Sequence, residues 1–148
     1  MGSEAAPRIG PAPEEVATTL MAIFLLDTTV IIDALRDRQH RPRQLMELLR
    51  SGNILACCPV NIAEIYAGMR PREEAATEAL LDSLQMLPIL PDVARLTGKL
   101  KQEYSKKGAT LNLADAMIAA TAIYHRAVLI TDNLCHFPMP ELTLHSLR

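Results

Sequence analysis

Three acidic residues lie inside segments that are otherwise apolar. Asp27 ends the run IFLL, Glu64 lies within NIAEIYAG, and Asp115 lies within LADAMIAATAIY. Burying an ionised carboxylate costs several kcal/mol, about a few pKa units, unless a cation or several hydrogen bonds compensate for the lost hydration. We therefore expect these three side chains to share a compensating partner.

A fourth acid, Asp132, follows an apolar run in the same way as Asp27. Ligands of open α/β sheets gather at the carboxyl ends of the strands, so Asp27 and Asp132 are expected at one rim of a sheet. Glu64 falls about one turn into a helix that follows another strand, and Asp115 falls in the first turn of its own helix. The sequence thus predicts that all four acids meet at this rim as catalytic residues.

Four carboxylates at one rim repel one another strongly, and a bound cation that prefers oxygen ligands would keep them ionised. We expect Mg²⁺ or Mn²⁺, with Asp27 and Asp115 as its ligands. Such an ion polarises a phosphodiester, lowers the pKa of a bound water and orients that water for in-line attack, so the predicted chemistry is phosphodiester hydrolysis. Taken singly, Asp27 and Asp115 could instead cap helices, and Glu64 could be an exposed helix residue.

The elements that must position these acids alternate along the chain. From Met21 onward, short apolar segments alternate with longer helix-like segments, a pattern typical of an α/β fold with a mostly parallel central sheet flanked by helices. Strands are expected at residues 23–26, 54–58, 87–90, 127–131 and 142–147. Helices are expected at residues 29–35, 43–50, 60–68, 73–84, 92–106 and 113–124.

Composition limits the domain organisation and the partners. Residues 1–20 are rich in Ala, Pro, Gly and Glu, so we expect a flexible tail before a single domain over residues 21–148. With 15 Lys and Arg against 17 Asp and Glu, the formal net charge is −2, and a nucleic-acid partner must use a local basic patch. Three cysteines, two of them adjacent, make no disulfide framework, and no apolar run is long enough for a membrane span. We expect a cytoplasmic protein with no membrane contact.

Four segments carry a resemblance to a known family. In this order and spacing, FLLDTTVIIDAL, NIAEIYAG, LNLADAMIAATAI and LITDNLCHF resemble the PIN-domain family and, within it, the VapC-type toxins of bacterial toxin–antitoxin pairs. The likeness covers residues 21–148. It implies a PIN-like three-layer fold and a metal-dependent endoribonuclease that hydrolyses RNA phosphodiester bonds. It also implies a cognate antitoxin as partner and a homodimer.

The resemblance assigns roles to individual residues. It makes Asp27, Glu64 and Asp115 the first three catalytic acids. It also gives Thr28 and Thr29, which follow the first acid, a supporting role toward the metal ion or its water. Helix capping is the alternative role for the two threonines.

The fourth position of the family pattern has two candidates here. Members of the family place Asp or Asn shortly after a strand-ending Thr, and Thr131 is followed by both Asp132 and Asn133. Asn133 fits the T-x-N pattern of the toxins better, and Asp132 is kept as an outer acid. The number of metal ions, one or two, stays open for the same reason.

Two further features concern the partners. A basic run after the first acid could hold RNA phosphates or could be a solvated loop; it contains Arg36, Arg38, Arg41 and Arg43. The segment 60–87 carries more apolar residues than one sheet face needs, which favours a groove for an amphipathic antitoxin helix. A basic side chain of that partner, placed among the acids, would displace the metal ion. Cys135 and His136 lack the second ligand pair of a zinc site.

The residues around Asp27 argue against two other functions. A haloacid-dehalogenase-like phosphatase needs a second acid two residues after the strand-ending Asp, and this chain has Thr29 there. A phospho-receiver domain needs an acidic pair before its strand-end acceptor, and only residues 1–20 and one strand precede Asp27. A housekeeping PIN-type nuclease and a catalytically silent PIN-like module that binds RNA or protein remain open alternatives. The sequence names neither the RNA target nor the antitoxin.

Overall fold

A single parallel sheet forms the centre of the molecule. The computed structural model describes residues 8–9 and 21–148. Over this part of the chain the sheet has six strands in the order β1-β6-β5-β2-β3-β4, and each neighbouring pair is parallel. The strands are β1 (Arg8–Ile9), β2 (Ile23–Leu26), β3 (Ile54–Cys57), β4 (Gln85–Met86), β5 (Val128–Ile130) and β6 (Thr143–His145).

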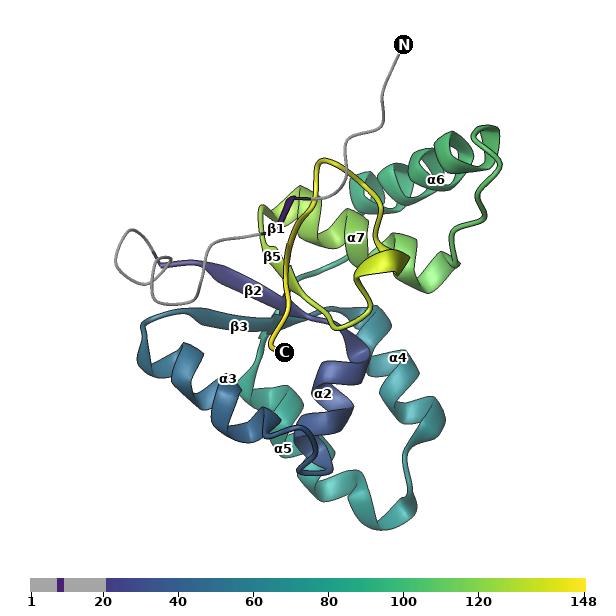
Figure 1. The fold of residues 1–148 in the computed structure, drawn as a ribbon. Helices are drawn as coiled ribbons and strands as arrows, with labels where there is room; N and C mark the ends of the chain where they lie inside the picture. Colours follow the sequence, from purple (N-terminus) through teal and green to yellow (C-terminus); the bar gives the residue numbers. More distant parts are fainter. Residues whose placement is uncertain (1–7, 10–20) are drawn as a thin grey trace.

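Helices cover both faces of this sheet. Figure 1 shows α6 and α7 on one side of the sheet and α2, α3 and α5 on the other. The bounds are α2 (Thr28–Leu35), α3 (Arg41–Arg50), α4 (Pro59–Gly68), α5 (Glu74–Ser83), α6 (Pro91–Lys106) and α7 (Leu113–His125), with short 3-10 turns η1 (Pro71–Glu73) and η2 (Leu134–His136). The predicted α/β class, with a parallel sheet between two layers of helices, is confirmed.

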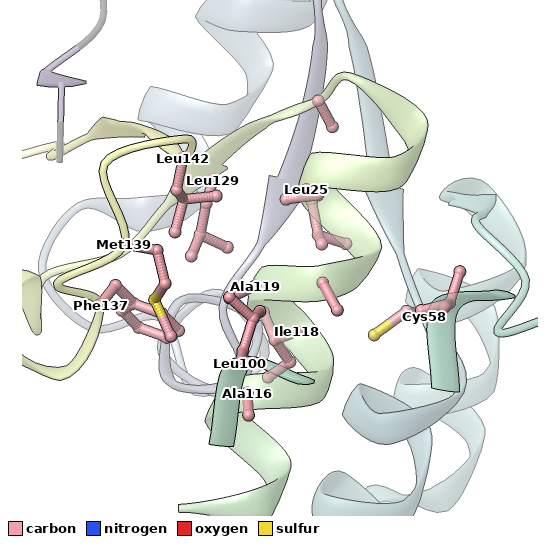
Figure 2. Packing of buried hydrophobic residues seen from close by; sticks show 14 of the residues in the cluster. Leu25, Cys58, Leu100, Ala116, Ile118, Ala119, Leu129, Phe137, Met139 and Leu142 are labelled. Atoms are coloured by element: carbon pink, nitrogen blue, oxygen red, sulfur yellow. The ribbon is translucent and has the colours of Figure 1, made fainter. Parts of the chain in front are cut away.

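The two layers have separate hydrophobic cores because successive strand residues point to opposite faces. Phe24 and Leu26 of β2 belong to the core under α2 and α3, whereas Leu25 between them belongs to the core under α6 and α7. On the second side, Ala116 and Ala119 of α7 are fully buried against the sheet (Figure 2). Such small side chains let a helix approach the sheet closely, which brings the start of α7 toward the end of β2.

The fourth strand differs from its prediction. A strand was expected at residues 87–90, but β4 is Gln85–Met86. The backbone N–H of Leu87 continues the pairing by donating to the carbonyl oxygen of Cys57 at 2.8 Å. Pro88 has no N–H to donate to a sheet, so the ladder stops there. Leu87 and Ile89 instead pack into the core of the α6 and α7 side.

One strand lies within the expected tail. Arg8 and Ile9 pair with Thr143 and Leu144 of β6 and extend the sheet by one short edge strand. Two residues are too few to leave a periodic pattern in the sequence, so this strand was not predicted. The rest of the expected tail, residues 1–7 and 10–20, lies outside the described residues. Within the described part of the chain, no helix has the length and apolar character needed to span a membrane.

Candidate active site

Asp27 occupies the end of β2 and the start of α2 at once. Its Oδ1 accepts the backbone N–H of Thr28 at 2.9 Å, which caps α2, and its Oδ2 accepts the hydroxyl of Thr131 at 2.7 Å. The side chain is buried, with 5% of the residue exposed. Because Leu26 pairs with Ile130, Thr131 is the residue level with Asp27 on the neighbouring strand. Helix capping and a place at the carboxyl rim are therefore combined in one residue.

Two threonine hydroxyls hold carboxylates in the same manner. Thr28 Oγ1 accepts the side-chain amide of Asn61 at 2.9 Å and donates to Glu64 Oε1 at 2.6 Å. Thr131 Oγ1 accepts the backbone N–H of Asn133 at 2.9 Å and donates to Asp27. A hydroxyl has one proton, so an amide donor on its oxygen leaves that proton for the carboxylate. Each of these two chains of hydrogen bonds thus fixes the orientation of one carboxylate.

Asn61 belongs to this site and was missed by the sequence analysis. It is fully buried, and its Oδ1 accepts the backbone N–H of Cys58 at 2.8 Å, which caps α4. Its amide group holds the Thr28 hydroxyl. The available signal was its position three residues before Glu64, at the third residue of a helix that starts with Pro59, where side chains reach back to the helix start.

Asp115 enters the site from the other layer. Asn112 caps α7 by accepting the backbone N–H groups of Ala114 at 2.8 Å and Asp115 at 3.2 Å. The Asp115 side chain is 25% exposed, and its Oδ2 lies 3.5 Å from His136 Nδ1 in η2. The predicted first-turn position of Asp115 is confirmed, and its carboxylate remains partly open to solvent.

The three acids act on one another electrostatically. Burial raises the pKa of Asp27 above its ordinary value, and the charges of Asp115 and Glu64 raise it further, while hydrogen bonds from Thr131 and Thr28 lower it. Burial also raises the pKa of Asp115, as does the charge of Glu64, and His136 lowers it. The charges of Glu64 and Asp115 thus act on Asp27, and the charge of Glu64 acts on Asp115, so these three residues form one acid cluster.

The donor set of this cluster suits a hard cation, in an open arrangement. Among the described residues, no three His, Cys, Asp or Glu side chains converge closely enough to hold a metal ion by themselves. Mg²⁺ keeps several of its waters and commonly takes only one or two carboxylates from a protein. Asp27 and Asp115, whose charges interact, supply two carboxylates from neighbouring elements, which is the number that such an ion commonly takes.

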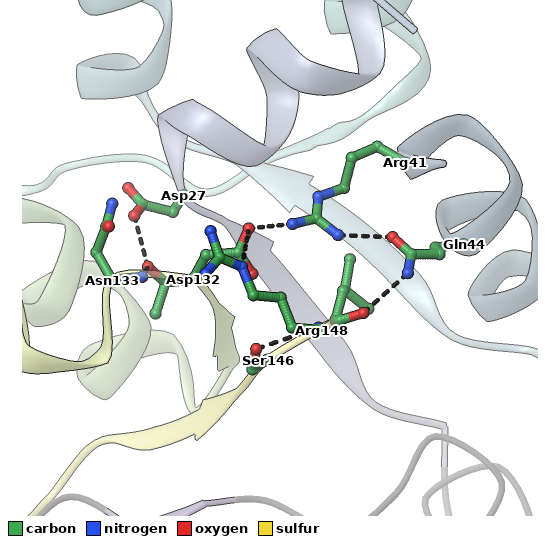
Figure 3. Close-up of polar contacts among 9 residues, drawn as sticks. Asp27, Arg41, Gln44, Asp132, Asn133, Ser146 and Arg148 are labelled. Atoms are coloured by element: carbon green, nitrogen blue, oxygen red, sulfur yellow. Dashed lines mark hydrogen bonds and ion pairs between the residues drawn. The ribbon is translucent and has the colours of Figure 1, made fainter. Parts of the chain in front are cut away.

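Asp132 does not join the three acids, contrary to expectation. Its carboxylate forms an ion pair with Arg41, and Arg148 Nε lies 3.8 Å from the same Oδ2. Figure 3 shows the Asp132 side chain directed toward Arg41, whereas Asn133 lies on the side of Asp27. Of the two candidates for the fourth position, Asn133 is the one beside the acid cluster.

The remaining predicted residues are distributed differently from the expectation. Thr29 is exposed on α2, so Thr28 is the threonine within the network. Arg36 is paired with Glu73 by two hydrogen bonds of 3.1 and 3.2 Å. Arg41 is 1% exposed, and its predicted RNA contact is wrong because the side chain turns inward to Asp132. The exposed arginines of the basic run are Arg38 and Arg43.

Comparison with known families gives the site its context. The family model described as PIN domain matches residues 24–134, a span that contains Asp27, Glu64 and Asp115. The chain belongs to the PIN-domain family. This confirms the resemblance seen in the sequence.

The relatives of this PIN domain carry the VapC name. It is 37% identical to ribonuclease VapC19 of Mycobacterium tuberculosis over 119 residues, which cover 80% of this chain and 95% of the relative. It is 34% identical to ribonuclease VapC10 of the same organism over 119 residues, which cover 80% of this chain and 89% of the relative.

Solved structures of toxin–antitoxin complexes contain the same fold. The structure of VapBC2 from Rickettsia felis bound to a promoter DNA fragment matches with a TM-score of 0.76 and 25% identity, covering 85% of this chain and 99% of that one. A toxin–antitoxin complex from Klebsiella pneumoniae matches with a TM-score of 0.65 and 30% identity, covering 80% of this chain and 93% of that one.

Proposed function

We propose that this PIN domain is a metal-dependent endoribonuclease and the toxin of a type II toxin–antitoxin pair. The observation that carries the proposal is the shared cluster of Asp27, Glu64 and Asp115 at the carboxyl rim of the sheet, with the pKa values of Asp27 and Asp115 raised. The chain matches most of the length of two relatives that are named ribonucleases. A phosphodiesterase needs such an electronegative site for a divalent ion beside its substrate.

In the proposed mechanism Asp27 and Asp115 hold a Mg²⁺ or Mn²⁺ ion. Such an ion, when bound, would supply charge compensation and polarise the phosphodiester. Glu64 is exposed at the rim, and Thr28 fixes its Oε1, so it can accept a proton from the attacking water. The water oxygen bonds to phosphorus while the bond from phosphorus to the leaving oxygen breaks, and this oxygen keeps the electron pair and takes a proton from solvent. Thr131 keeps Asp27 in place throughout.

RNA has an open space to occupy next to this cluster. A cavity of about 390 Å³ is lined by Asn112, Asp115, Cys135 and His136, among others. Its lining mixes polar and apolar atoms and includes one of the acids, so a nucleotide bound there would lie against the proposed metal ligand. The exposed Arg38 supplies positive charge for RNA phosphates at a different point of the surface.

The proposed antitoxin has a groove of its own on the other layer. A cavity of about 460 Å³ with a mainly apolar lining lies between α2, α3 and α5, and Leu35, Met46, Leu49, Leu80 and Leu84 are among its lining residues. We assign an amphipathic helix of the antitoxin to it, because solved complexes of similar proteins contain an antitoxin. A basic residue of the same partner would compete with the metal ion among the acids.

The groove differs in composition from the expected one. The apolar surplus of residues 60–87 was expected to form it, but Ile65 and Leu81 from that segment are buried in the core, with 3% and 8% exposed. Helices α2 and α3 supply much of the lining instead. Met46 and Leu49 of α3 are both 46% exposed, so they are available to a partner. The VapC resemblance also supports a cytoplasmic location and a homodimer, and sedimentation of the purified protein would test the homodimer.

A cleavage assay tests the enzymatic part of the proposal. The purified chain should cleave single-stranded RNA with Mg²⁺ or Mn²⁺ and lose this activity in EDTA. Asp27→Asn should be inactive although folded. RNA or protein binding without any cleavage would favour the silent binding module instead.

Growth assays test the toxin part separately. Expression of the chain alone should arrest its host, Asp27→Asn should not, and co-expression of an adjacent small gene encoding the antitoxin should restore growth. If the active enzyme is harmless when expressed alone, the housekeeping nuclease is the remaining interpretation.

A further inference from the structure

A buried ion pair joins the loop after β5, residues 131–133, to helix α3 on the opposite layer of the fold. Arg41 is the first residue of α3, and Asp132 follows β5; their side chains are 1% and 8% exposed. Arg41 Nη1 also donates to Gln44 Oε1 at 2.6 Å, and Gln44 Nε2 donates to Leu147 O at 2.8 Å. As Figure 3 shows, Arg41 and Gln44 thereby connect α3 with both the loop after β5 and the C-terminal segment.

Stability alone gives a poor reason for this pair. A buried ion pair loses the hydration of both groups, and an apolar pair of similar size is often as stable or more stable. A positive side chain at the N-terminus of a helix also opposes the helix dipole. Within the described residues, Arg41 Nε and Asp132 Oδ1 are buried without a hydrogen-bond partner. The pair is therefore not arranged for the largest gain in folding free energy.

The position of Asp132 suggests what the pair does. Its neighbours on both sides belong to the chain of hydrogen bonds behind Asp27: the N–H of Asn133 donates to Thr131 Oγ1, which donates to Asp27 Oδ2. Holding Asp132 from the opposite layer fixes the backbone that carries both contacts.

We propose that Arg41 and Asp132 form a positioning clamp for the acid loop, residues 131–133. The clamp sets the direction in which Thr131 presents its hydroxyl to Asp27. Asp132 thus acts on catalysis through the loop and not as a metal ligand. This inference rests on the proposed nuclease function, and its test therefore includes one readout that needs no activity.

The test compares Arg41→Met, Asp132→Leu and the double variant with wild type. Each single variant leaves one buried charge without its partner, so both should be destabilised, whereas the double variant should regain most of the lost thermal stability. In the double variant kcat should still fall about 10- to 100-fold, because an acid displaced by about 1 Å aligns the reacting groups poorly. KM should stay within about twofold, and any fall in Mn²⁺ affinity should be similar in Arg41→Met and Asp132→Leu, since both substitutions act on the proposed ligand Asp27 only through the loop. Arg41→Lys, which keeps the charge, should retain more of kcat than Arg41→Met.

Hydrogen exchange supplies the readout that is independent of activity. The amide proton of Asn133, bonded to Thr131 Oγ1, should exchange about tenfold faster or more in the double variant. The amide of Asp27, bonded to Ile130 O at 2.9 Å between the two strands, serves as the internal control and should not change.

Three outcomes would overturn the clamp. The first is a double variant with restored stability and wild-type kcat, which would make the pair purely structural. The second is a Mn²⁺ affinity that drops tenfold in Asp132→Asn but not in Arg41→Met, which would make Asp132 a ligand. The third is unchanged exchange of the Asn133 amide. Absence of metal-dependent cleavage in wild type would instead contradict the proposed function, and the exchange measurement would still decide whether the clamp holds the loop.

Discussion

Asp27 and Asp132 follow two neighbouring parallel strands, yet their carboxylates face opposite layers of the molecule. Leu26 pairs with Ile130, so Asp27 is level with Thr131, and Asp132 is one residue further along the chain, beyond the end of β5. Successive side chains of an extended chain point to opposite faces, and an offset of one residue is enough to reverse the direction.

The two faces give the same residue type different surroundings. Asp27 lies with Asp115 and Glu64, and burial together with the charges of these two acids raises its pKa, whereas Asp132 is paired with Arg41. Asn133, one residue further again, returns to the side of Asp27 (Figure 3). An acid after a strand therefore identifies the edge of the sheet, but the register decides which layer it meets.

The largest expected effect comes from removing charge on the Asp27 side. Asp27→Asn should lower the kcat of metal-dependent RNA cleavage at least about 100-fold, because a metal ligand is lost while the amide oxygen can still accept the N–H of Thr28. Circular dichroism should show an unchanged fold. Asp33→Asn, six residues further along the same chain segment in α2, is the matched control and should keep wild-type activity. Full activity of a pure Asp27→Asn protein would remove Asp27 from the mechanism.

The second largest effect is a loss of stability, expected when the charge of Asp132 is removed. Asp132→Asn leaves the buried guanidinium of Arg41 without a counter-charge, so the free energy of unfolding should fall by about 3 kcal/mol in urea titrations. The control is Asp92→Asn, whose partner Arg95 is 70% exposed and which should change stability little. Equal effects of the two substitutions would mean that burial does not distinguish the two ion pairs.

Much of this comparison was accessible from the sequence, but three features were not. Strands β2, β3 and β5 and the acids of the cluster were predicted because apolar runs mark buried strands and an acid next to one is conspicuous. The face of Asp132 depends on strand register, and the inward turn of Arg41 depends on a partner 91 residues away. Asn61 was missed because a buried amide between apolar neighbours looks like an ordinary residue near a helix start.

A smaller effect on stability is expected from the charge of the acid cluster. The pKa of Asp27 is raised above 3.8 in the fold, so the folded state binds this proton more tightly than the unfolded chain. The free energy of unfolding then falls as the pH rises from about 3.8 through the folded pKa, and the loss persists above it. Without metal, Asp27→Asn should therefore be more stable than wild type at pH 7, which urea titrations of both proteins would measure.

Measurements at several pH values test the origin of this difference. The advantage of Asp27→Asn should shrink as the pH falls through the folded pKa and below the ordinary pKa of Asp, where the wild-type carboxyl is protonated in both states. Saturating Mn²⁺ should raise the midpoint of wild type more than that of the variant, since binding to the folded state alone stabilises it. A wild type that is the more stable protein at pH 7 without metal would contradict the raised pKa of Asp27.

The smallest expected effect concerns Thr131, which precedes Asp132 in the chain and donates its hydroxyl to Asp27. Its hydroxyl bond lowers the pKa of Asp27, so Thr131→Val should raise that pKa and move the acidic limb of the pH profile of kcat/KM to higher pH. At neutral pH the loss of kcat should be several-fold only, because the N–H of Thr28 still holds the other oxygen of Asp27. Thr131→Ser keeps the hydroxyl and should retain the wild-type profile. If Thr131→Val and Thr131→Ser shift the limb equally, the hydroxyl is not what sets the pKa, and the acid loop acts on Asp27 by packing alone.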